Sequence, residues 1–109
     1  MTGGGRHNRR EERKYKRITV RYGAPEPTHR GTALQISTRG FFVSTNGVIF
    51  EKGSPIVIEI KGPDENWIVP AVVRHAYKVH PSFAHVTRPG MGIELLVVAP
   101  ALRDYLASL

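Results

Sequence analysis

The stretch Gln35-Ile36-Ser37-Thr38-Arg39-Gly40 decides how this chain folds, together with the upstream basic run Arg9-Arg10-Glu11-Glu12-Arg13-Lys14-Tyr15-Lys16-Arg17. Apolar residues flank it directly, at Leu34 and at Phe41-Phe42-Val43. Ser37 and Gly40 predict a tight turn between two strands. A small hydroxyl, a glycine and an arginine at such a turn direct donors and backbone N–H groups to one patch of solvent. We expect this patch to hold a flat, anionic ligand, with the upstream arginines brought over it.

Strand-like segments extend outward from this turn in both directions. Side chains alternate with a period of two over 18–22 and 56–60, and strand-forming residues recur over 30–36, 41–45, 67–77 and 92–98. A period of two indicates half-buried strands. Asn46-Gly47 and the proline-containing segment 23–27 are turn signals between them. Pro70 indicates an edge position or a bulge near the start of the long strand 67–77.

A single helix is expected at the C-terminal end. Pro100 suits a first helical turn, and four apolar or aromatic residues after it share one helical face: Leu102, Tyr105, Leu106 and Leu109. Six short strands with regular turns and one terminal helix predict an all-β fold, a six-stranded antiparallel barrel.

Three short motifs occur in order along the chain. Arg-x-x-x-Arg is formed by Arg13-Lys14-Tyr15-Lys16-Arg17, and by the overlapping Arg9–Arg13. Gln35–Gly40 is similar to Asp/Asn-x-Ser-x-x-Gly, and Gly90-Met91-Gly92-Ile93-Glu94-Leu95 is similar to a closing GMGVEF strand. Together they resemble the signature of PilZ domains, bacterial receptors for cyclic di-GMP. The resemblance covers residues 9–109 and implies the same barrel architecture.

The resemblance implies roles for individual residues. In the family the first arginine of the motif contacts guanine and phosphate and the second supports the same ligand, which here implies Arg13 and Arg17, with Arg9 as the alternative first arginine. Guanidinium groups pair bidentately with phosphate and with the guanine edge. Ser37 would donate to a base or phosphate, and Gly40 would allow positive φ and a close backbone approach. Arg39 adds a phosphate contact or stays solvent-exposed. A stacked pair of nucleotides would need further arginines, and Arg9, Arg10 and Arg39 are available.

Gln35 departs from the family's pattern, which has Asp or Asn at this position. Gln keeps the amide but adds a methylene, so the amide lies further out and costs more rotamer entropy to fix. Two hypotheses follow. Gln35 reaches the base from a shifted pose, or the site no longer binds the nucleotide.

Length and charge define one domain with a basic arm. The 109 residues suit a single domain with a modest core. We expect residues 1–8 to be a flexible tail and residues 9–109 to be the domain, with its basic arm at 9–17. The net charge is +7, and residues 1–17 hold seven basic against two acidic residues. The basic character therefore belongs to the arm, which indicates an anionic partner or a solvated tail.

Several classes of function lack their residues. There is no Cys, and no phosphate loop, paired-carboxylate cluster or helical metal pair, since His75, His80 and His85 are five apart. We expect no enzyme, no metal and no cofactor. Without a membrane-length apolar run or a signal-peptide apolar region, a cytoplasmic protein is expected. Arg74 could face the ligand or the barrel rim, and surface ion pairing is the favoured use. Five aromatic residues are assigned to core or barrel-mouth packing: Phe41, Phe42, Phe50, Trp67 and Phe83.

The sequence therefore predicts a non-catalytic signalling receptor that binds cyclic di-GMP and relays the signal to an unidentified protein partner. The basic arm would fold over the nucleotide, an order–disorder switch without chemistry. One alternative is a degenerate PilZ-like adaptor that acts through protein contacts alone. Another is a small basic barrel that binds RNA or DNA, which the aromatic pattern does not favour because those rings are not interleaved with basic residues.

Overall fold

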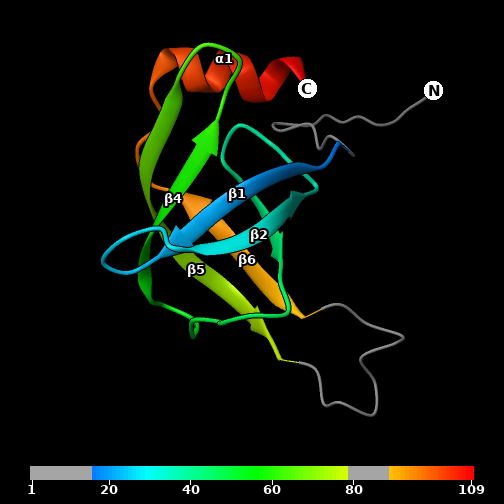
Figure 1. Cartoon of the computed structure of the whole chain (residues 1–109), viewed down its shortest axis with the longest axis vertical. Helices are drawn as coiled ribbons and strands as arrows, with labels where there is room; N and C mark the ends of the chain where they lie inside the picture. The colour runs from blue at the N-terminus through cyan, green and yellow to red at the C-terminus, as the bar shows by residue number, and fades with distance from the viewer. Residues whose placement is uncertain (1–15, 79–88) are drawn as a thin grey trace, which may run out of the picture.

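Six antiparallel strands close into a barrel in the computed structural model, which describes residues 16–78 and 89–109. The elements are β1 (Ile18–Gly23), β2 (His29–Leu34), β3 (Gly40–Ser44), β4 (Pro55–Lys61), β5 (Asn66–Tyr77), β6 (Gly90–Leu95) and α1 (Pro100–Ser108). Around the barrel the order is β1-β2-β3-β6-β5-β4, and every neighbouring pair is antiparallel. Figure 1 shows α1 lying across one end, beside the hairpin of β4 and β5. The predicted fold class is confirmed.

The strand boundaries agree with the sequence to within one or two residues, except at the last strand. The prediction for that strand was 92–98, whereas β6 spans Gly90–Leu95. Leu96 and Val97 are exposed, and the Leu96 N–H donates to the Pro70 carbonyl at 2.9 Å. These branched residues have the composition of a strand, but α1 begins at Pro100, so the chain must leave the sheet before it. Most of the predicted connection 78–89 lies outside the described residues.

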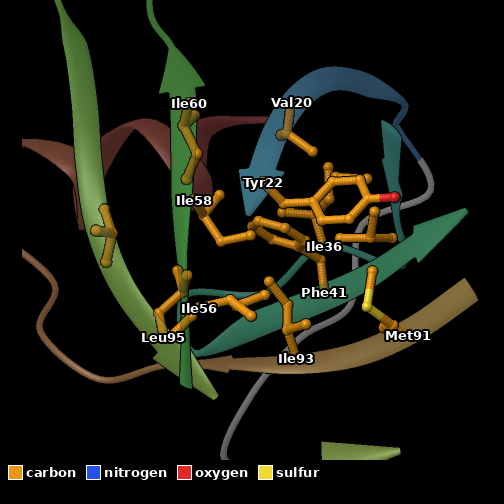
Figure 2. Close-up of a cluster of buried hydrophobic side chains, with 14 of the residues drawn as sticks. Val20, Tyr22, Ile36, Phe41, Ile56, Ile58, Ile60, Met91, Ile93 and Leu95 are labelled. Atoms are coloured by element: carbon orange, nitrogen blue, oxygen red, sulfur yellow. The ribbon is translucent and has the colours of Figure 1, made fainter. Parts of the chain in front are cut away.

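The core fills the barrel with the inward side chains of every strand (Figure 2). On β4 the inward residues are Ile56, Ile58 and Ile60, which are all buried, because alternate side chains of a strand point to the same face. Leu102 and Leu106 of α1 are buried in the same cluster. The helix therefore closes one end of the barrel, as its predicted apolar face requires. In the described part of the chain, no helix has the length and apolar character to cross a membrane.

An irregularity in β5 changes which side chains face outward. The register on β6 shifts between Val73 and His75, so Arg74 is an extra residue in β5. Val73 is buried, whereas Arg74 and His75 are both exposed. Such a bulge re-aims side chains and interrupts the alternation of faces. Pro70 pairs with Val57 of β4, and the ladder with β6 begins one residue later, at Ala71. Because β5 lies between β4 and β6 in a closed barrel and its bulge lies at Val73/His75, neither the edge position nor the bulge predicted near Pro70 is found.

Candidate functional site

Ser37 shapes the turn between β2 and β3 through its own hydrogen bonds. Its N–H donates to the Gly40 carbonyl at 2.9 Å, and its hydroxyl donates to the same carbonyl at 3.2 Å. The Arg39 N–H donates to Ser37 Oγ at 3.2 Å. The predicted tight turn is therefore present. Arg39 in this turn is exposed. Because the Ser37 hydroxyl donates to the Gly40 carbonyl, it would donate to a ligand only if that hydrogen bond were broken.

Gly40 is required by the close approach of two strands. Its φ is not positive; in the described residues the positive values belong to Gln35, at 53°, and Gly53, at 91°. A Cβ on Gly40 would lie 2.1 Å from the carbonyl oxygen of Ile93 on β6. The N–H of Leu95 donates to the Arg39 carbonyl at 2.8 Å, which holds the turn against β6. The expected positive φ at Gly40 is therefore wrong, and the close backbone approach found here is made to β6.

Gln35 occupies the left-handed backbone conformation at the start of the turn. A left-handed φ costs L-residues energy because Cβ approaches the following carbonyl oxygen. Asn and Asp are several-fold enriched there because their short polar side chains hydrogen-bond locally. The backbone at residue 35 therefore suits Asn or Asp better than Gln, independently of any ligand.

Replacing Gln35 with Asn is expected to raise the free energy of unfolding by about 0.5–1 kcal/mol, because Asn tolerates this backbone better. Urea unfolding of the full chain measures the change. The control is Gln35→Ala, which also shortens the side chain but brings no local hydrogen-bonding group. Equal stability of the Asn and Ala variants would contradict the backbone argument.

A pocket of about 600 Å³ lies beside this turn, on the outer face of β3, β5 and β6. The turn contributes Gln35, Ser37, Arg39 and Gly40 to its lining, so four of the predicted site residues are brought together. The volume falls within the range of small-molecule sites. The turn and the outer faces of three neighbouring strands therefore form one concave surface.

Gly92 forms an open floor in this pocket. It pairs with Phe42 of β3 on one side and with His75 of β5 on the other. A Cβ built on Gly92 would come no closer than 3.7 Å to the described atoms, all of them in His75. Tyr77 is 51% exposed, with ring centroids 5.9 Å from Phe42 and 6.2 Å from His75. Exposed ring faces beside an open floor offer a surface on which a planar base can stack.

Arg74 and Glu94 give the pocket its charge, together with Arg39. Arg74 Nη2 and Nε both lie 2.6 Å from Glu94 Oε1. The ion pair predicted for Arg74 is therefore present, but the bulge in β5 also places this residue in the pocket lining. Arg39 and Arg74 bring two positive charges to the described lining, and Glu94 brings one negative charge. This excess of one positive charge suits an anionic ligand.

The remaining predicted arginines precede β1. Arg17 is exposed, lies one residue before β1 and does not line the pocket. Arg9, Arg10 and Arg13, and with them the tail 1–8 and most of the basic arm, lie outside the described residues. β1 begins at Ile18 opposite Ala33, and β2 ends one residue later at Leu34, directly before the turn. The basic arm therefore joins the barrel at the end that carries the turn.

Sequence analysis missed His75, Tyr77 and Gly92 as pocket residues. It assigned Phe42 to packing, whereas Phe42 is half-buried and also lines the pocket. Strict alternation along β5 would put Arg74 and His75 on opposite faces, and only the bulge brings them to one face. Within residues 16–78 and 89–109, no three His, Cys, Asp or Glu side chains gather to hold a metal ion. Phe83, His80 and His85 lie outside the described residues.

Comparison with known proteins identifies the class to which this barrel and its turn belong. The family model of the PilZ domain matches residues 7–109, so the chain belongs to the PilZ domain family. Among solved structures, the chain is similar to the Bacillus subtilis inhibitor of motility MotI/DgrA, with a TM-score of 0.72 and 23% sequence identity. The similarity covers 94% of this chain and 49% of that one, so this chain spans about half of its length. No curated protein matches the sequence.

Proposed function

We propose that this chain is a receptor for cyclic di-GMP, and that the pocket beside the Gln35–Gly40 turn holds the nucleotide. The observation that carries the proposal is that this turn, which includes Arg39, lines a pocket of about 600 Å³ together with Arg74 and the exposed ring of Tyr77. PilZ domains are a family of cyclic di-GMP receptors, and the chain belongs to that family. Guanidinium groups match the phosphates and the guanine edge, and an aromatic face matches the base.

The basic arm completes the site in this proposal. Arg13 and Arg17 close over the nucleotide from the end of the barrel where β1 meets the turn, with Arg9 as the alternative first arginine. Arg10 and Arg39 supply further contacts, as a stacked pair of nucleotides would require. Binding then changes the surface that the arm and the outer face of the barrel present. No chemical step is involved.

In this proposal a protein partner recognises the changed surface and binds according to it. The solved structure to which this chain is similar is titled an inhibitor of motility. We therefore propose a protein of the bacterial motility apparatus as the first partner to test. Capture with and without cyclic di-GMP measures this link, and capture that does not depend on the nucleotide would favour an adaptor that acts through protein contacts alone.

Calorimetric titration of cyclic di-GMP into the full chain tests the receptor proposal. We expect a micromolar or tighter Kd, weakened by about 10- to 100-fold in Arg13→Ala because a charge-assisted bidentate contact is lost. Arg103→Ala is the matched control, since Arg103 is an exposed arginine on α1, outside the pocket lining.

Three results would count against the proposal. Absence of binding to the native chain together with binding to Gln35→Asp would indicate a degenerate site. Absence of binding to both would refute the nucleotide hypothesis. Tight, strongly salt-dependent binding of long oligonucleotides without preference for the cyclic dinucleotide would instead favour a nucleic-acid-binding barrel.

A further inference from the structure

Glu94 is the one acidic side chain in the described lining of a pocket that otherwise carries positive charge. On β6 it pairs with Gly40 on one side and with Val72 on the other. Glu94 therefore lies between the turn, which ends at Gly40, and the β5 bulge, which follows Val72 and Val73. Gly40 has no side chain that could cover Glu94 from the side of the turn. A carboxylate in the lining of an anion-binding pocket repels an anionic ligand, because like charges repel.

Glu94 forms an ion pair with Arg74, an arginine of the same pocket lining. Arg74 directs two N–H groups, on Nε and Nη2, to the single oxygen Oε1. A phosphate oxygen accepts the same fork of donors, so a phosphate can replace this carboxylate without loss of either hydrogen bond. The bulge in β5 keeps Arg74 on the outer face beside Glu94, where both side chains line the pocket.

The pair is also easily exchanged. The Arg74 side chain is 57% exposed and that of Glu94 is 35% exposed. Ion pairs in contact with water contribute little to stability, because solvent and salt screen them. An anionic ligand that brings its own contacts can therefore separate the two side chains.

We propose that Glu94 is paired with Arg74 before the ligand binds and that the ligand phosphate then replaces Glu94 as the partner of Arg74. Because this ion pair must be broken, Glu94 lowers the affinity of the site for its ligand. This inference rests on the proposed cyclic di-GMP site. It assigns Glu94 a negative contribution to binding, which is opposite in sign to that of every arginine around it. Glu94 is thus a residue that determines affinity, and the ligand displaces its carboxylate from Arg74.

A double-mutant cycle tests the proposal by titrating cyclic di-GMP into the full chain in its native, Glu94→Gln, Arg74→Ala and doubly substituted forms. Glu94→Gln is expected to bind about two- to fivefold more tightly, the strength of an exposed ion pair. The gain should shrink in the Arg74→Ala background, because no guanidinium is left to release. High salt should reduce it as well. Glu59→Gln is the matched control: Glu59 is a half-buried glutamate on β4, outside the pocket lining.

Two results would overturn the inference while leaving the proposed function intact. Equal or weaker binding by Glu94→Gln would mean that the carboxylate does not oppose the ligand. A gain of equal size in both backgrounds would mean that Glu94 acts by simple repulsion and does not restrain Arg74.

If the native chain binds no cyclic di-GMP, the proposed function is refuted, but the exchange between Glu94 and a phosphate can still be tested with a second measurement. The Nε–Hε signal of Arg74 is then followed by NMR during titration with inorganic pyrophosphate. A shift at lower pyrophosphate concentration in Glu94→Gln than in the native chain would support the exchange of partners. A shift at the same concentration in both, or in neither, would overturn it.

Discussion

Substitution of Gly40 by alanine is expected to lower the thermal midpoint by about 10 °C or more, through a loss of about 3 kcal/mol in the free energy of unfolding. The new Cβ would lie 2.1 Å from the carbonyl oxygen of Ile93 and 3.2 Å from the Cα of Glu94. These are backbone atoms of the neighbouring strand, so no side-chain rotation relieves the overlap. The turn must separate from β6, and the bond from the Leu95 N–H to the Arg39 carbonyl weakens with it.

Gly92→Ala is the matched control for this experiment. It makes the same change two residues before Glu94, where the nearest described atoms would be 3.7 Å from the new methyl group. We expect its unfolding midpoint to remain within a few degrees of the native value. A Gly40→Ala protein as stable as Gly92→Ala would contradict the close approach of β3 to β6.

Substitution of Gly92 by valine is expected to weaken cyclic di-GMP binding by about 50-fold or more while the barrel stays folded. Valine suits a half-buried strand position such as that of Gly92, and its methyl groups would lie on the pocket floor, where a base would otherwise lie beside Tyr77. Base–aromatic stacking is worth about 1–3 kcal/mol per base, and a blocked floor forfeits it together with neighbouring contacts. Calorimetry measures the affinity, and circular dichroism verifies the fold.

A graded series makes this result specific. The loss should increase from Gly92→Ala to Gly92→Val, because the added volume increases at one point. Thr19→Val is the matched control, since it places the same side chain on an exposed position of β1 outside the pocket lining. Unchanged affinity in Gly92→Val would mean that the ligand does not occupy the floor between Phe42 and His75.

The fold could be predicted from local patterns because this barrel obeys them almost everywhere. Ile56, Ile58 and Ile60 alternate with outward residues, and Pro100 begins the helix as expected. The last strand was misplaced because Leu96 and Val97 have strand-forming side chains yet lie in the connection to α1. Only the path of the chain to the helix, a tertiary property, excludes them from the sheet.

The sequence predicted the site residues that belong to one continuous motif, but not those that neighbouring strands bring beside it. The motif located the turn and four of its residues, but the sequence alone could not reveal a bulge at Arg74, which brings His75 to the same face. It also could not distinguish two uses of Gly40, since a glycine that avoids a neighbouring strand and one that adopts positive φ look identical in sequence. The positive φ proved to belong to Gln35.

The most direct test of this account is an NMR titration of the ¹⁵N-labelled full chain with cyclic di-GMP. We expect the amide signals of Ser37–Gly40 and Gly92 to shift in a saturable manner, while those of α1, which packs at the Trp67 end of β5, stay in place. Shifts confined to residues outside the pocket, or no shift at saturating nucleotide, would contradict the claim that this turn and the face of β3, β5 and β6 form the binding site.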